Sequence, residues 1–223
     1  ISAWKMALHL LVPVIVSILL NEIQSNAFRR ISQTLIYLPH FLSWIILAGI
    51  LIDLLSPNGG LVNRFLGLFG AEPIFFLGSN KWFRFTLVFT DVWKEFGFGT
   101  IVYLAAITNI DPTQYEAATI DGANRFQRIM HVTLPNMRMI IVLMMVLSLG
   151  NVLNAGFDQV YNMYSEAVYS TGDILDTFIY RLSFKNGLWG QSAAVSMFKS
   201  VVSTLFISVS YLCAYKFADY RVF

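Results

Sequence analysis

Charged side chains are scarce in this chain of 223 residues. Lys, Arg, Asp and Glu together make up 13% of the sequence, whereas about 25% is usual in a soluble domain. Hydrophobic residues make up 57%. This is more than a soluble domain of this size can bury and far more than a disordered chain contains. The composition therefore predicts an integral membrane protein.

Cysteine, histidine and catalytic motifs are also scarce or missing. The single cysteine, Cys213, excludes an internal disulfide, and His9, His40 and His131 are too far apart in sequence to suggest a metal site. A net charge of +2 gives no indication of nucleic-acid binding. The sequence contains no P-loop, His-Glu-x-x-His or Gly-x-Ser-x-Gly pattern. We therefore expect no catalytic residue, metal or cofactor on this chain.

Long hydrophobic runs occupy most of the sequence. A helix needs about 20 mostly apolar residues to cross a bilayer, and these runs lack the strict alternation of barrel strands. The prediction is an all-α polytopic membrane protein with one transmembrane domain over 1–223. Its five predicted spans are 3–20, 33–54, 84–108, 137–156 and 196–216.

The most polar helical region lies between the third and fourth predicted spans, at 109–136. Asp111 is expected to cap a helix that begins at Pro112, and Gln114 is expected to complete a capping box. The pattern therefore predicts the start of a short helix outside the bilayer.

A turn signal at Asp121-Gly122 is expected to end this helix. A second helix then leads to Pro135, which either stops it or opens the fourth span. Glu116 and Asp121 can accept hydrogen bonds from a partner. Small residues give the hairpin a surface that another backbone can approach closely: Ala117, Ala118, Gly122 and Ala123. From these residues alone, the hairpin either packs on its own spans or docks onto another protein.

The same residues resemble a family signature. Glu116-Ala117-Ala118, followed by Gly122, Ile129 and Leu134-Pro135, is similar to the EAA signature of binding-protein-dependent ABC importer permeases. The resemblance implies that 109–135 is a cytoplasmic coupling helix, which docks onto a separate ATPase, and that Pro135 sets the bend into the fourth span. The expected coupling residues are Glu116, Ala117, Ala118, Asp121, Gly122, Ala123 and Pro135.

The resemblance extends to most of the chain. The family core has six spans and we predict five, so the abrupt start at Ile1 leads us to expect that the first span is missing. Tyr37-Leu38-Pro39 and Trp93 with Gly97 and Gly99 are similar to the sugar-importing branch. The stretch 157–194 is similar to permeases for oligosaccharides and polysaccharide fragments.

The resemblance implies a type I permease subunit in the bacterial plasma membrane that imports oligosaccharides or polysaccharide fragments. The implied partners are a second permease subunit, usually a different chain, two cytoplasmic ATPase subunits that carry ATP and Mg²⁺, an extracytoplasmic solute-binding protein, and membrane lipid. Two alternatives remain open. One is the same architecture with a non-sugar solute, and the other is a stand-alone channel or secondary transporter.

Charged residues within the third predicted span permit two interpretations. Asp91 has same-face helical spacing to both Lys94 and Glu95. Charges are costly in the bilayer core, so they either line a watery path in which Trp93 stacks on a sugar, or lie at the outer headgroup level near Arg84.

The end of the fourth span and the predicted extracytoplasmic loop 157–195 supply further polar candidates. Asn151 and Asn154 share a helix face, and with Asp158 they either line the substrate path or bond to neighbouring helices. Tyr161 begins a tyrosine-rich stretch that either faces a sugar or forms an interfacial aromatic belt. The substrate-path candidates are Trp93, Asn151, Asn154, Asp158 and Tyr161.

Overall fold

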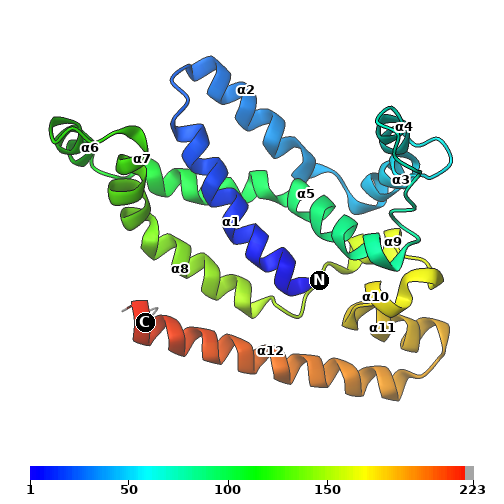
Figure 1. Cartoon of the computed structure of the whole chain (residues 1–223). Coiled ribbons are helices and arrows are strands. Elements are labelled where there is room, and N and C mark those ends of the chain that lie inside the picture. The colour runs from blue at the N-terminus through cyan, green and yellow to red at the C-terminus, as the bar shows by residue number, and fades with distance from the viewer. Residues whose placement is uncertain (219–223) are drawn as a thin grey trace. The chain divides into compact units, whose positions relative to one another are not determined.

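The computed structural model describes the backbone of residues 1–218 and the side chains through Leu212 (Figure 1). Every regular element within the described range is helical. In chain order they are α1 (Ser2–Asn21), α2 (Asn26–Tyr37), η1 (Leu38–Phe41), α3 (Trp44–Leu54), α4 (Leu61–Gly67), α5 (Asn80–Thr108), α6 (Pro112–Ile120), α7 (Arg125–Arg128), η2 (Ile129–Thr133), α8 (Leu134–Gly150), α9 (Phe157–Met163), η3 (Glu166–Val168), α10 (Tyr169–Gly172), α11 (Leu175–Tyr180), η4 (Arg181–Lys185) and α12 (Trp189–Ala218).

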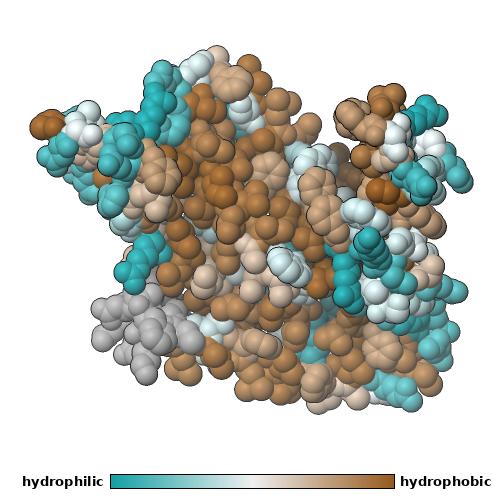
Figure 2. All heavy atoms as spheres, in the orientation of Figure 1, coloured by the Kyte–Doolittle hydropathy of each residue, from teal (hydrophilic) through white to brown (hydrophobic). Residues whose placement is uncertain are grey.

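The predicted class of all-α polytopic membrane protein is confirmed. Three stretches within the described residues are long and apolar enough to cross a membrane: Ser2–Asn21, Arg125–Gly150 and Trp189–Leu212. Figure 2 shows hydrophobic side chains along much of α12. Met197 and Phe198 on this helix are 70% and 65% exposed, as expected of a surface that faces lipid or another subunit.

The second predicted span is wrong as a single straight helix over 33–54. The chain bends by 100° between Asn26–Phe41 and Trp44–Leu54. Pro39 has no amide hydrogen to continue a helix, and the Ser43 side chain accepts a hydrogen bond from the amide of Ile45 (3.2 Å), which caps a new helix. The bent pair forms either one broken span or a re-entrant segment.

The third predicted span becomes α5, which is longer than expected and less apolar than the other spans. It begins at Asn80. It carries five charged residues: Lys81, Arg84, Asp91, Lys94 and Glu95. It is not among the three stretches of the described residues whose length and composition suit a membrane span.

The chain divides into two compact units. Unit 1 contains 1–5, 41–92 and 151–204, and unit 2 contains 6–40, 93–150 and the chain from Leu205 onward. The core of unit 1 includes Ala48, Leu77, Phe83, Leu87, Val160, Met163 and Val168. The core of unit 2 is formed by Tyr103, Ile107 and Met137, with Val14, Ile18, Ile140, Ile141 and Met144 packed against it. The single transmembrane domain over 1–223 stays a prediction.

Two glycines allow helices to pack closely within unit 2. A Cβ atom on Gly97 of α5 would lie 1.9 Å from the carbonyl oxygen of Ile36 in α2. A Cβ atom on Gly99 would lie 3.1 Å from Pro13 in α1. A glycine at position 97 is therefore required by the backbone of the neighbouring helix, as expected of small residues between spans.

Candidate functional site

The helical hairpin at residues 109–135, called the coupling hairpin after the role that the sequence predicts for it, begins as expected. The Asp111 carboxylate accepts a hydrogen bond from the Thr113 amide (2.9 Å), and Pro112 is the first helical residue of α6. This hydrogen bond lowers the pKa of Asp111. The helix ends at Asp121, and Gly122 follows with a φ of 79°, a conformation that favours glycine.

The predicted role of Gln114 is wrong. Its side-chain oxygen accepts a hydrogen bond from the Asn136 amide (2.8 Å), so it holds α6 against the start of α8 and does not complete a capping box. The hydroxyls of Tyr115 and Thr133 lie 3.0 Å apart and add a second link between α6 and η2. These links keep the two arms of the hairpin together.

The capping box of this region lies on the second arm. The Asn124 side-chain oxygen accepts a hydrogen bond from the backbone amide of Gln127 (2.9 Å). The Gln127 side-chain oxygen accepts one from the backbone amide of Asn124 (2.8 Å). This reciprocal pair starts α7 immediately after the turn. The rigid start of α7 fixes the angle between the two arms.

The coupling hairpin presents an open groove of about 320 Å³. Glu116 and Ala117 are exposed beside it. Ile120 is 86% exposed and Phe126 is 69% exposed, so the hairpin turns large apolar side chains outward. The groove is lined by Ala118, Asp121, Gly122, Ala123, Gln127, His131 and Val132. This arrangement favours docking onto another protein over packing on the chain's own spans.

Pro135 opens α8 and does not stop the preceding helix. It lies in the first turn of α8, directly after the π-helical turn η2. Because proline cannot donate a backbone hydrogen bond, a wider turn before it lets the helix continue. The stretch Arg125–Gly150 therefore runs from the coupling hairpin into the fourth span without a break.

The substrate-path candidates Asn151 and Asn154 lie in the connection between α8 and α9, not in a span. Helix α8 ends at Gly150, six residues before the predicted end of the span at 156. Both asparagines are exposed, and the Asn154 side-chain amide donates to the side-chain oxygen of Asn151 (3.2 Å). Asp158 is exposed in the first turn of α9.

Tyr161 belongs to a chain of aromatic rings in unit 1. Its ring centroid lies 5.2 Å from Phe157 and 4.8 Å from Tyr180, and its hydroxyl donates to the Tyr180 hydroxyl (3.2 Å). This hydrogen bond raises the pKa of Tyr180. Here the predicted loop 157–195 is largely helical. The other rings in the chain are Tyr164, Tyr169, Phe184 and Trp189.

Arg181 closes one end of this aromatic chain. Its guanidinium lies 4.4 Å from the ring centroid of Tyr169 and pairs with the Asp173 carboxylate, which raises the pKa of Arg181. Burial raises the pKa of Tyr164 to about 12. At neutral pH Tyr164 and Tyr180 therefore keep their hydroxyl protons and Arg181 keeps its charge.

Trp93 is 41% exposed on α5 and belongs to unit 2. The other four candidates lie in unit 1. Within unit 1 the structure thus brings Asn151 to Asn154 and Tyr161 to an aromatic chain.

The charged residues of α5 find partners that helical spacing did not predict. Asp91 is paired with Lys5 (3.2 Å), in unit 1. In unit 2, the Glu95 carboxylate contacts Lys94 (2.7 Å) and the His40 ring (2.7 Å). The pairs of Asp91 with Lys5 and of Glu95 with His40 join different elements, which helical spacing within α5 does not predict.

The partner of Asp91 and the polar residue beside it escaped prediction. Lys5 and Gln159 are 5% and 0% exposed, although neither has a local sequence signal for burial. Lys5 donates a hydrogen bond to the side-chain oxygen of Gln159, which is 154 residues away in sequence. Only an unexpected lysine at the edge of the first apolar run hinted at this site.

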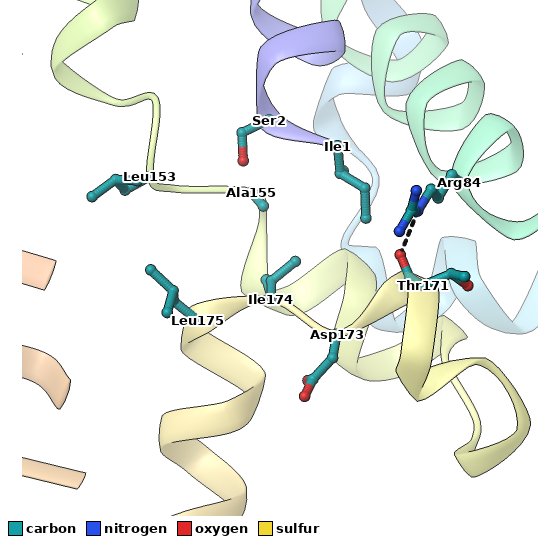
Figure 3. A pocket seen from close by; sticks show the side chains of 9 residues that line it. All are labelled: Ile1, Ser2, Arg84, Leu153, Ala155, Thr171, Asp173, Ile174 and Leu175. Atoms are coloured by element: carbon teal, nitrogen blue, oxygen red, sulfur yellow. Dashed lines mark hydrogen bonds between the residues drawn. The ribbon is translucent and has the colours of Figure 1, made fainter.

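A cavity of about 350 Å³ lies next to this region in unit 1. Figure 3 shows Arg84 of α5 directed at the carbonyl oxygen of Thr171, to which its Nε donates a hydrogen bond (2.7 Å). The cavity is lined by Ile1, Ser2, Arg84, Leu153, Ala155, Thr171, Asp173, Ile174 and Leu175. Among the described residues, no group of three or more His, Cys, Asp or Glu side chains is placed to hold a metal ion.

The sequence of this chain, a membrane protein with an exposed helical hairpin between two spans, matches a known family. The family described as binding-protein-dependent transport system inner membrane component matches residues 9–222. The chain belongs to this family. It is a multi-pass membrane permease.

Similar proteins are known in bacteria. The chain is 38% identical over 221 residues to the polygalacturonan/rhamnogalacturonan transport system permease protein YteP of Bacillus subtilis, covering 99% of this chain and 69% of that protein. It is 41% identical over 211 residues to protein LplB of the same organism, covering 95% and 66%. The chain thus spans about two thirds of the length of both relatives.

Solved structures share the fold. A bacterial ABC transporter involved in the import of the acidic polysaccharide alginate contains a chain with a TM-score of 0.92 and 35% identity, covering 97% of this chain and 77% of that one. The alginate transporter in complex with an alginate pentasaccharide-bound periplasmic protein gives a TM-score of 0.91 and 36% identity, covering 96% and 76%.

Proposed function

We propose that this chain is a permease subunit of an ATP-driven, binding-protein-dependent importer for saccharides in the bacterial plasma membrane. The observation that carries the proposal is the family match over 9–222, together with the exposed coupling hairpin. A second permease subunit and an extracytoplasmic binding protein complete the path for the solute. The periplasmic protein bound to the alginate transporter supports the latter partner.

The driving force is ATP hydrolysis with Mg²⁺ on two partner ATPase subunits. The open groove, the exposed Glu116 and the outward-facing Ile120 suit a partner with an apolar pocket and a donor for the carboxylate. Because Arg125–Gly150 is one continuous helical stretch, a push on the hairpin is passed to the fourth span.

The substrate class is acidic oligosaccharides. Two similar systems support it, one for polygalacturonan and rhamnogalacturonan and one for the acidic polysaccharide alginate. The half-buried aromatic chain around Tyr161 offers ring faces for sugars, and Arg84 and Arg181 supply positive charge in the same unit. Uptake of labelled acidic and neutral oligosaccharides by the complete importer tests this class. Uptake of neutral sugars alone contradicts it.

Two substitutions in the coupling hairpin test the ATPase contact. Glu116→Lys reverses an exposed charge and Ala118→Leu fills the groove, so each should lower ATPase recovery with the permease and reduce uptake about tenfold or more. Glu72→Lys is the matched control, since Glu72 is exposed in unit 1. Normal ATPase recovery and uptake in both hairpin variants would sink the proposal.

The alternative of a channel or secondary transporter has a separate test. Vesicles that contain this protein without ATPase subunits should show no saccharide uptake with or without an ion gradient. ATP-independent uptake in those vesicles would favour the alternative.

A further inference from the structure

A buried polar cluster in unit 1 joins three parts of the chain that are far apart in sequence. It consists of Lys5 from α1, Asp91 from α5 and Gln159 from α9. Lys5 is 5% exposed, Asp91 is 7% exposed and Gln159 is 0% exposed. Burying an ion pair is costly unless its members are fully hydrogen-bonded, so the cluster calls for an explanation beyond stability.

The Lys5 ammonium has three hydrogens, and the cluster provides three acceptors. It donates to the carbonyl oxygen of Ala155 (2.7 Å) and to the side-chain oxygen of Gln159, and it pairs with Asp91 (3.2 Å). One of the three is thus a backbone atom of the connection between α8 and α9. The charge of Lys5 is therefore tied directly to the position of that connection.

The Gln159 amide fastens the same segment to α5. Its nitrogen donates to the carbonyl oxygen of Leu87 and to the Thr90 hydroxyl, both at 2.8 Å. Its oxygen accepts from Lys5. All the main hydrogen-bonding positions of the side chain are used, so the start of α9 is held in one position and one rotation.

The backbone between these anchors lies against the cluster. Gly156 has a φ of 87°, and a Cβ atom there would lie 3.3 Å from the Lys5 ammonium and 3.8 Å from Asp91. No other residue type fits this conformation and this close approach without strain. The backbone conformation of the connection between α8 and α9 thus depends on both Gly156 and the cluster.

Exposed candidates alternate with the anchored residues. Asn154 precedes Ala155, which is 3% exposed, and Asp158 precedes Gln159. Asn154 and Asp158 themselves are exposed. Holding Ala155 and Gln159 in place therefore fixes where the two exposed polar side chains point.

We propose that Lys5, Asp91 and Gln159 are positioning residues that set the α8–α9 connection, and with it Asn154 and Asp158, in the path of the saccharide. This inference rests on the proposed function for the saccharide, but the position of the connection is measurable without it.

The test uses the complete importer with Lys5→Met and Asp91→Leu combined. An apolar pair of similar size avoids an unpaired buried charge, so the complex should assemble. Two properties are measured: the labelling rate of a cysteine placed at Asn154 by a membrane-impermeant thiol reagent, and the number of saccharides taken up per ATP hydrolysed. The labelling experiment uses a background in which Cys213 is replaced by serine.

We expect the double variant to change the labelling rate severalfold and to lower the uptake per ATP about tenfold, since small displacements of contact groups have effects of this size. Thr86→Val is the matched control, because Thr86 is 4% exposed on the same helix and its hydroxyl bonds only to the carbonyl oxygen of Trp82 (3.0 Å). The control should match the wild type in both measurements.

An unchanged labelling rate in an assembled double variant would overturn the inference and reduce the cluster to a stabilising contact. If the double variant is not recovered, Gln159→Met keeps the ion pair and should give the same labelling change. A changed labelling rate without saccharide uptake in the wild type would support the positioning role and contradict the proposed function.

Discussion

The coupling hairpin and the Lys5–Asp91–Gln159 cluster are both polar, and they are built in opposite ways. The hairpin is held by hydrogen bonds between residues at most 22 positions apart and leaves Glu116 and Ile120 exposed. The cluster joins residues up to 154 positions apart and leaves almost nothing exposed. A surface that binds a partner must stay open, whereas an internal anchor must satisfy every polar atom.

The difference predicts how each region responds to the loss of one charge. Lys5→Met alone leaves Asp91 buried without its ammonium partner, and we expect a loss of about 3–5 kcal/mol in the free energy of unfolding. Thermal unfolding of the purified complex, with Lys5→Met compared to Lys5→Met plus Asp91→Leu, checks this. The double variant should be the more stable of the two, and equal stability would contradict the prediction.

Two glycines sharpen the comparison, because both have a positive φ. Gly156→Ala meets backbone strain together with the Lys5 ammonium at 3.3 Å, whereas Gly122→Ala meets strain in open space. Strain alone costs about 1–3 kcal/mol, so Gly156→Ala should lower the midpoint of thermal unfolding more than Gly122→Ala. The two variants are measured side by side in the same complex. A larger effect at Gly122 would show that the cluster tolerates displacement.

The hairpin was largely predictable because its signals are local. Asp111, Pro112 and Gly122 act on atoms within a few residues, so their spacing in the sequence determines the cap, the first turn and the stop. The same reasoning gave the wrong role for Gln114, which does not complete a capping box. Asn136, which is 22 residues away, competes for its side chain, and only the fold brings the two together.

The cluster and the bend were not predictable in this way. The pair of Lys5 with Asp91 joins α1 to α5 only after the chain has folded, so helical spacing within α5 does not predict it. Pro39 lies in the predicted second span, yet the bend also depends on Ser43 beginning a new helix. The sequence indicated Asn151 and Asn154 as polar candidates, but their exposure follows from the end of α8 at Gly150.

A smaller effect is expected where the hairpin's two arms are joined. Tyr115→Phe removes the hydroxyl that lies 3.0 Å from Thr133, a buried side chain. A single neutral hydrogen bond contributes about 1 kcal/mol, so the variant should lose some protection of α6 from hydrogen exchange while the cluster around Gln159 keeps its own. Equal loss of protection in α6 and α9 would mean that the two regions do not behave separately.

The smallest effect concerns the pH dependence of the hairpin. The Thr113 amide lowers the pKa of Asp111 below its usual value of 3.8, so the charged form is favoured in the folded protein. The cap's contribution is complete above the pKa of the unfolded chain and is lost as the pH falls through the lowered value. Hydrogen exchange at the start of α6, corrected for the intrinsic rate, should therefore rise on acidification in the wild type. Asp111→Asn keeps a neutral acceptor at every pH, so its exchange should not change over the same range. A wild type that responds like this variant would show that the Asp111 charge does not hold the start of the hairpin. The capping box of Asn124 and Gln127 would then be the local polar contact that shapes this surface.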